Sequence, residues 1–282
     1  MSQEKYAISS IGTVGAFING RACSDTLFHV LSRAFEHPMT DEERAAMPFA
    51  GGMMQHGYQC GMIWGATLAA GAQAYRLFGA GPQTEAKAII AAQRLVEAFR
   101  GRNKHIDCFE LTETNKSSST WQMITFFLLK GGTIRCFHRA ADYAPPAMAA
   151  INAALSEELV EPPPAPVSCA ALMARKMGAS DLHATMAAGL AGGIGLSGGA
   201  CGTLGAAIWI MGLKSLKAGA AKLEYKDPKM LDVIEKFLKC TGFEFECSKI
   251  VGRQFESVGD HAAYVCGGGC AKILEVLADA TA

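Results

Sequence analysis

The sequence lacks an excess of charge of either sign. Its 26 Lys and Arg residues balance 26 Asp and Glu residues, and no long basic or acidic run occurs. A surface that binds nucleic acid or an anionic membrane needs clustered positive charge. The composition therefore predicts neither nucleic acid nor an anionic membrane surface as a partner.

A targeting signal is also missing from the sequence. Residues 1–6 include an acidic residue where a signal peptide carries positive charge, and no apolar run of signal length follows. Residues 189–213 are uncharged and long enough to span a bilayer, but nine of them are glycine. Glycine at that density suits a tightly folded backbone better than a membrane helix. We therefore expect a cytoplasmic protein without a membrane span.

Several catalytic and binding motifs are absent. The sequence has no Cys-x-x-Cys pair and no Cys-x-x-Cys-His haem attachment site. It also has no Walker loop, no convincing Ser-His-Asp set and no dinucleotide fingerprint after a strand. The histidines are scattered, and we interpret His56 and His138, which lie near cysteines, as solvated or capping residues.

Strand patterns are rare, whereas helical ones are frequent. The best alternating pattern covers residues 243–246 and is very short. Apolar residues recur at helical spacing in residues 27–35, 84–100, 228–238 and 271–278. Pro145-Pro146 is interpreted as the start of a helix that closes the first half, because proline is tolerated in a first turn. We therefore predict an all-α fold.

Cysteine, in contrast, is abundant, and eight of the ten cysteines form two sets of four. The first set is Cys23, Cys60, Cys108 and Cys136, and the second is Cys169, Cys201, Cys247 and Cys270. Successive members are 37, 48 and 28 residues apart in the first set and 32, 46 and 23 in the second. Randomly placed core cysteines would not recur in register, so the sets predict an internal duplication.

The residues around the second cysteine of each set support this register. An Ala-Gly-Gly triplet begins ten residues before Cys60 and again ten residues before Cys201, and a glycine follows each cysteine directly. Three consecutive prolines at residues 162–164 separate the two sets and favour an extended linker. We predict two homologous helical-bundle repeats, over residues 1–155 and 167–282, joined by a linker over residues 156–166.

Four thiols per repeat suit a tetrahedral metal site or one iron–sulfur cluster. Structural disulfides are not expected in a cytosolic chain, because the compartment keeps thiols reduced. The wide spacings differ from the close pairs of zinc ribbons and bacterial ferredoxins. We therefore expect the ligands to come singly from four helices packed around one buried point.

The Ala-Gly-Gly turns have two interpretations. Glycine lets backbone N–H groups approach sulfur closely, and a helix that starts at the cysteine would lower the thiol pKa through its dipole. Alternatively, the glycines only permit tight helix crossing. Trp64 and Trp209 follow the paired cysteines and are expected to shield the core.

These motifs resemble those of the C_GCAxxG_C_C family of redox-active proteins. In the second half the resemblance is carried by Ala191–Gly195, Cys201-Gly202, the Cys247–Gly252 segment and Cys270. In the first half it is weaker and is carried by Ala50–Gly52, Cys60-Gly61, Cys108–Leu111 and Cys136. The family is similar to the iron–sulfur part of split-Soret cytochromes, which implies a small helical fold, a cluster and electron transfer. The chain lacks haem motifs, so no haem role is carried over.

The leading hypothesis is a cytosolic iron–sulfur protein that transfers electrons, with the eight cysteines holding up to one cluster of unspecified nuclearity per repeat. It implies a redox partner protein and leaves a homo-oligomer open. The alternatives are a metal-free thiol–disulfide redox enzyme and a zinc-stabilised interaction module. Cys240 and Cys266 have no counterpart in the first half; Cys266 could replace Cys270 as a ligand, but Cys270 is favoured.

Overall fold

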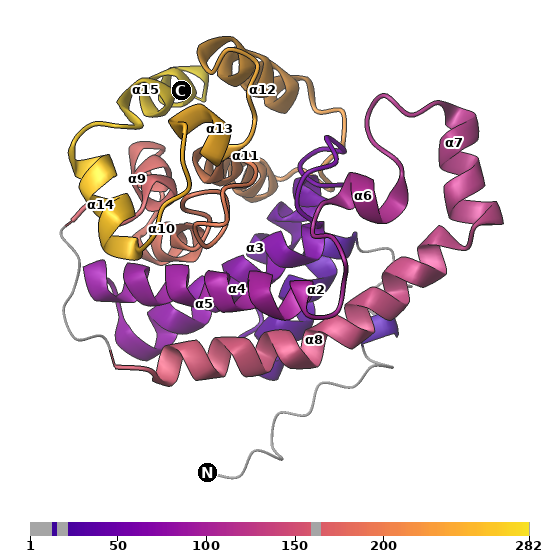
Figure 1. Cartoon of the computed structure of the whole chain (residues 1–282), viewed down its shortest axis with the longest axis horizontal. Helices are drawn as coiled ribbons and strands as arrows, with labels where there is room; N and C mark the ends of the chain where they lie inside the picture. Colours follow the sequence, from indigo (N-terminus) through magenta and orange to yellow (C-terminus); the bar gives the residue numbers. More distant parts are fainter. Residues whose placement is uncertain (1–12, 16–21, 159–164, 282) are drawn as a thin grey trace.

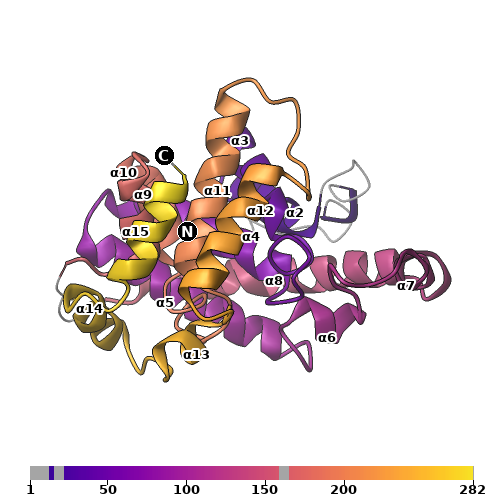
Figure 2. The same cartoon turned by 90° about the horizontal axis from the view of Figure 1, so that it is seen from above.

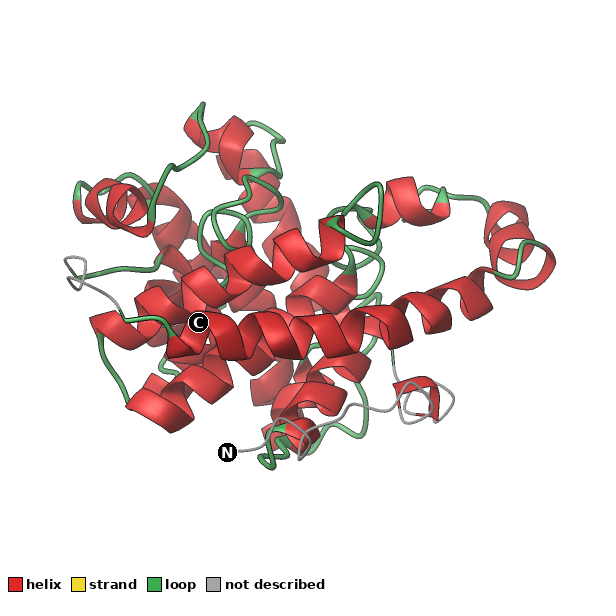
Figure 3. Ribbon diagram, turned by 60° about the horizontal axis from the view of Figure 1, so that its bottom comes forward, coloured by secondary structure: helices red, strands yellow, loops and turns green. Residues whose placement is uncertain are grey.

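The computed structural model describes residues 13–15, 22–158 and 165–281. Within these residues every regular element is a helix, and the only β pairing consists of two isolated bridges. Figure 3 shows red helices joined by green loops. The prediction of an all-α fold is confirmed. Residues 1–6, on which the expectation of no signal peptide rests, and the three linker prolines lie outside the described residues.

The helices follow a similar order in the two halves. The first half contains α2 (Cys23–Ala34), α3 (Thr40–Ala45), the 3-10 turn η2 (Met47–Phe49), α4 (Gly61–Phe78), α5 (Pro82–Arg100), α6 (Cys108–Thr112), α7 (Thr120–Ile124), the π turn η3 (Thr125–Leu129) and α8 (Gly132–Ser156). The second half contains α9 (Cys169–Lys176), α10 (Asp181–Ala188), α11 (Gly202–Lys217), α12 (Pro228–Cys240), α13 (Cys247–Val251), α14 (Val258–Cys266) and α15 (Ala271–Ala280). Internal duplication remains a prediction, which this order supports.

The four segments with helical spacing all lie on helices. The 27–35 segment falls largely within α2, and the other three fall within α5, α12 and α15. Helix α12 illustrates the cause: Pro228 stands at its start, and the Asp227 side chain accepts hydrogen bonds from the N–H groups of Lys229 and Met230 at 2.9 and 3.1 Å. One face of α12 is then buried in the core.

The prediction for Pro145-Pro146 is wrong. Helix α8 begins at Gly132, so the two prolines lie inside it rather than at its start. Proline removes an N–H donor and its ring crowds the preceding turn, which kinks a helix without necessarily ending it. Figure 1 shows α8 changing direction along its length. Buried residues on both sides of the prolines, such as Ala141 and Ile151, hold the bent helix on the core.

Glycines allow the two halves to pack closely around one hydrophobic core. A Cβ atom at Gly71 of α4 would lie 2.5 Å from the Met186 Cα atom of α10, and one at Gly189 would lie 2.9 Å from the Ala88 carbonyl oxygen. A Cβ atom at Gly205 of α11 would meet the Trp64 ring at 2.4 Å. Several glycines of the uncharged stretch therefore serve close packing between the halves. No helix in the described part of the chain is long and apolar enough to cross a membrane.

Polar contacts also join the halves. The Gln59 side chain donates to the Gly193 carbonyl at 3.0 Å and accepts from the Ala200 N–H at 2.9 Å. The indole of Trp209 donates to the Glu42 carbonyl at 3.1 Å. Trp64 and Trp209 are both fully buried, as expected for core residues.

Close packing at Gly71 makes a testable prediction. Gly71→Ala should destabilise the protein by about 1–3 kcal/mol, because the new methyl group meets the backbone of α10. Urea unfolding measures the change. The control is Gly259→Ala in α14, where the nearest atom would be 3.8 Å away and the free energy should change by less than about 1 kcal/mol. Equal effects of the two substitutions would contradict this packing.

Glu43 anchors α3 through a buried carboxylate. Its side chain accepts from Ser32 at 2.6 Å and from the Met39 N–H at 3.1 Å, and it pairs with His29 at 2.8 Å. Burial alone would raise the pKa of Glu43, but these three partners together lower it to about 2. The carboxylate therefore stabilises the folded state above its unfolded pKa near 4.5, and this contribution is lost as the pH falls toward 2.

Glu43→Gln should lower the free energy of unfolding by roughly 3 kcal/mol at neutral pH. The difference between wild type and variant should shrink as the pH falls from about 4.5 to about 2, because the wild-type carboxylate then becomes protonated. Denaturant titrations at several pH values measure it. A difference that stays constant over this range would show that the carboxylate charge is not responsible.

Candidate functional site

A left-handed turn precedes the second cysteine of each set. Gly51 and Gly52 have φ of 72° and 71°, and Gly192 and Gly193 have φ of 61° and 77°. A Cβ atom at Gly52 would lie 2.2 Å from the Tyr58 carbonyl oxygen, and one at Gly193 would lie 2.4 Å from that of Gly199. Glycine is therefore required here both by conformation and by space.

Backbone hydrogen bonds then tie the second cysteine to the third. In the first half the Cys60 N–H donates to the Ile106 carbonyl and the Cys108 N–H donates to the Tyr58 carbonyl, both at 2.7 Å. The second half repeats this pattern: Cys201 N–H donates to the Phe245 carbonyl at 2.9 Å, and Cys247 N–H donates to the Gly199 carbonyl at 2.6 Å. Cysteines more than forty residues apart in sequence are thereby held side by side in both halves.

Seven of the eight cysteines stand where a helix begins. Cys60, Cys201 and Cys270 are the N-cap residues of α4, α11 and α15. Cys23, Cys108, Cys169 and Cys247 are the first residues of α2, α6, α9 and α13. Cys136 is the exception and lies within α8. The N-terminal end of a helix carries partial positive charge and unpaired N–H groups, which stabilise a nearby anion.

The first four thiols are close enough to affect one another's ionisation. Burial raises the pKa of Cys23 well above its usual value, and Cys60, Cys108 and Cys136 raise it further. Burial and Cys136 likewise raise the pKa of Cys108 to about 11. The Gly51 N–H donates to the Cys23 sulfur and opposes the rise in its pKa. This effect of Gly51 agrees, in the first half, with the interpretation that the Gly-rich turn directs an N–H group at sulfur.

The second four thiols also meet. A hydrogen bond from Cys270 lowers the pKa of Cys169 well below its usual value, and the same bond raises that of Cys270. Burial and then Cys169 raise the pKa of Cys201 to about 11. Burial, followed by Cys201 and Cys169, raises the pKa of Cys247. The thiols of the second set therefore share one environment, in which Cys270 and Cys169 have the strongest effect on each other's pKa.

The prediction that helix N-termini lower the thiol pKa is wrong in its net effect. The Met62 N–H does lower the pKa of Cys60, and the N–H groups of Leu204 and Thr203 lower that of Cys201. Burial nevertheless outweighs these bonds, so the pKa of both thiols is raised. The sequence indicates where the helices begin but not how deeply the sulfur atoms are buried.

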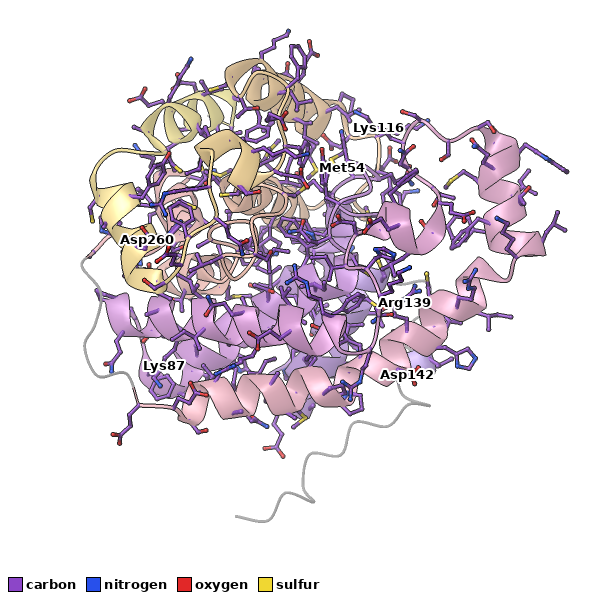
Figure 4. The ribbon with its side chains drawn as sticks, viewed as in Figure 1. Met54, Lys87, Lys116, Arg139, Asp142 and Asp260 are labelled. Carbon is purple, nitrogen blue, oxygen red and sulfur yellow. The ribbon has the colours of Figure 1, made fainter. Side chains whose placement is uncertain are left out.

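The two halves supply different cations to their thiols. Arg139 of α8, labelled in Figure 4, lowers the pKa of Cys136 against the larger effect of burial and forms a hydrogen bond with it. In the second half His261 forms a hydrogen bond with Cys169. His261 is 1% exposed, and its Nδ1 atom lies 3.0 Å from the Val167 carbonyl oxygen. Neither residue was singled out from the sequence. For His261 the reason is that 92 residues separate it from Cys169 and no motif links them.

The remaining cysteines lie elsewhere. Cys266 is exposed, and its thiol donates to the Ala165 carbonyl at 3.4 Å, whereas Cys270 is buried and bonded to Cys169. Cys240 ends α12 and packs against the hydrophobic core. The His56 Nδ1 atom donates to the Met53 carbonyl and its Nε2 atom accepts from Lys116, both at 2.8 Å, and the ring stacks on Phe245. These contacts agree with its interpretation as a capping residue.

The donors of each set are thiols, which as thiolates are ligands for zinc or for an iron–sulfur cluster. Within the described residues no group of three or more His, Cys, Asp or Glu side chains is arranged to hold a metal ion. The thiols of each set are nevertheless buried or half-buried together, and N–H groups point at several of their sulfur atoms. Such N–H···S bonds are a recurrent feature of cluster sites.

Comparison with known proteins identifies a family for the first set of thiols. Residues 21–136 match the family model described as "Putative redox-active protein (C_GCAxxG_C_C)", so this part of the chain is similar to that family. The matched range begins just before Cys23 and ends at Cys136. No curated protein and no solved structure matches the chain. The match falls on the half whose motifs are the weaker of the two, and it supports a redox-active protein.

Exposure of the cysteines makes a direct prediction. In the native, reduced and metal-free protein, Cys266 should react with Ellman's reagent about tenfold or more faster than the other nine thiols, because it alone of the cysteines is exposed. Stopped-flow absorbance measures the fast phase. Cys266→Ser should remove it, and the control Cys240→Ser should keep it. A fast phase that survives in Cys266→Ser would mean that a thiol of either set is accessible.

Proposed function

We propose that the chain is a redox protein that holds one iron–sulfur cluster in each half and transfers electrons. The observation that carries the proposal is that the thiols of each set affect one another's ionisation, with seven of the eight at helix N-termini. A bound cluster would accept and release single electrons. The first-set ligands would be Cys23, Cys60, Cys108 and Cys136, and the second-set ligands Cys169, Cys201, Cys247 and Cys270.

The surrounding residues suit a site of negative charge. Four thiolates in a buried place repel one another and lose their hydration, which is why most of these thiols have a raised pKa in the absence of metal. Helix N-termini, the Gly51 N–H and Arg139 supply compensating positive charge without reacting themselves. A cluster that binds the thiolates would remove the need to protonate them.

A second candidate function is thiol–disulfide exchange in the second half. The hydrogen bond between Cys270 and Cys169 brings two thiols into contact without metal. Oxidation of this pair would form one S–S bond and release two protons and two electrons to a disulfide or another oxidant. This reading explains one pair, whereas a cluster explains the gathering of all eight thiols.

The repeated turn, backbone bonds and helix order support an origin by internal duplication. A cytoplasmic setting agrees with ten free cysteines, since that compartment keeps thiols reduced. A protein that transfers electrons in this setting requires a redox partner protein. The proposal therefore includes an internal duplication, a cytoplasmic location and a redox partner protein.

The test is the iron and acid-labile sulfide content of the protein prepared without oxygen. Wild type should contain both, with visible sulfur-to-iron charge-transfer absorption. Cys201→Ser should lose roughly half of each, because the first half would keep its site. The control Cys266→Ser removes a cysteine outside both sets and should keep the full content.

Each other outcome identifies an alternative. If the protein is colourless and contains zinc, the result would support the zinc-stabilised module instead of the cluster. A metal-free protein with a Cys169–Cys270 disulfide after mild oxidation would support thiol–disulfide exchange. Full iron content in Cys201→Ser would show that Cys201 is not a ligand.

A further inference from the structure

A cavity of about 310 Å³ lies beside the first set of thiols. Cys23, Cys108 and Cys136 form part of its wall, while Cys60 is not among the residues that line it. This volume is at the lower end of the range for ligand pockets, roughly 300–1,000 Å³. The cavity is thus suited to a small molecule rather than to a large cofactor.

The described residues that line the cavity have uncharged side chains. Aromatic and apolar walls come from Met123, Phe126, Phe127, Phe137 and Tyr225, and polar groups come from Gln55, Thr112, Thr114, Thr133 and Asn115. Among the part of the lining that the structure describes there is no Asp, Glu, Lys, Arg or His. The described wall therefore offers no charged side chain to a phosphate, carboxylate or ammonium ligand, and the nearby Arg139 is engaged with Cys136. The lining therefore favours an uncharged ligand.

The aromatic walls other than Tyr225 belong to a projecting part of the molecule. Figures 1 and 2 both show α7 and the N-terminal part of α8 extending away from the helical body. Phe126 and Phe127 lie on η3 between these helices, with ring centroids 4.9 Å apart and planes at 79°. Aromatic side chains offer their faces and edges to a planar ring.

The polar groups are small and uncharged. Thr112 and Thr114 are largely buried, and their hydroxyl oxygens lie 2.9 Å apart. The Asn115 Oδ1 atom accepts from the Ser117 N–H at 2.9 Å, which directs its amide nitrogen away from that bond. The Thr112 hydroxyl already donates to the Cys108 carbonyl at 2.7 Å, so the amide groups of the wall are the donors for a planar molecule that carries carbonyl oxygens.

We propose that this cavity binds a small, uncharged aromatic carbonyl compound of the quinone class, next to the first set of thiols. Its use as an electron acceptor rests on the proposed function, whereas binding itself does not require a cluster. Cys23, Cys108 and Cys136 would lie on one part of the wall and the aromatic rings on another.

The test measures binding of duroquinone, whose ring is fully substituted and so cannot add to thiols. Isothermal titration of the full chain, metal-free under reducing-agent-free anaerobic conditions and again after iron and sulfide loading, gives the affinity. Phe127→Ala removes a cavity wall and should weaken binding about tenfold. Leu129→Ala, on the same π turn but not in the lining, should change it less than about twofold. Both side chains are partly exposed, so neither truncation empties the core.

The charge of the ligand supplies a second arm. Anthraquinone-2-sulfonate should bind at least tenfold more weakly than unsulfonated quinones, because the cavity offers its charge no partner. The proposal is overturned if duroquinone does not bind saturably to either form, if the two variants are equally affected, or if the sulfonate binds as tightly. Quinone binding to a protein that takes up no iron would support this site and refute the cluster. Iron uptake without quinone binding would support the cluster and refute this site.

Discussion

Everything in the proposed site depends on the backbone pairing between the Gly-rich turn and the third cysteine of each set. The bonds from Cys60 to Ile106 and from Cys108 to Tyr58 close a loop of more than forty residues around α4 and α5. The same bonds recur in the second half at Cys201 and Cys247. A side chain at Gly52 or Gly193 would collide with the chain that makes this pairing, so the glycines fix where the thiols meet.

Ionised thiols in a buried place destabilise the fold unless nearby groups compensate for their charge. The two halves use different groups for this compensation. Burial raises the pKa of most of the eight cysteines, while helix N-termini and N–H groups act in the opposite direction. The first half adds Arg139 and opens onto an uncharged cavity, whereas the second half adds His261 and a direct bond between Cys270 and Cys169. Similar scaffolds therefore surround unlike sites, which suits two centres with different roles in one protein.

Local features of the fold could be predicted from the sequence, and features that depend on distant residues could not. Apolar spacing located α5 and α12, and the repeat pointed to four cysteines per half, which the structure brings together. The tolerance of proline in a first helical turn led to a wrong prediction for the start of α8. Core contacts hold this helix across prolines that would end an isolated one. Nothing near Cys169 indicates His261, and nothing in residues 189–205 indicates that Gly189 and Gly205 pack against the first half rather than against a cluster.

The most direct test of the central claim is X-ray absorption at the iron edge of the protein purified without oxygen. The account predicts iron surrounded by sulfur at about 2.3 Å, with a further shell of iron neighbours, because cysteine thiolates and sulfide would supply every ligand. Iron bound mainly by nitrogen or oxygen, or as isolated ions without iron neighbours, would contradict a cluster held by the eight cysteines.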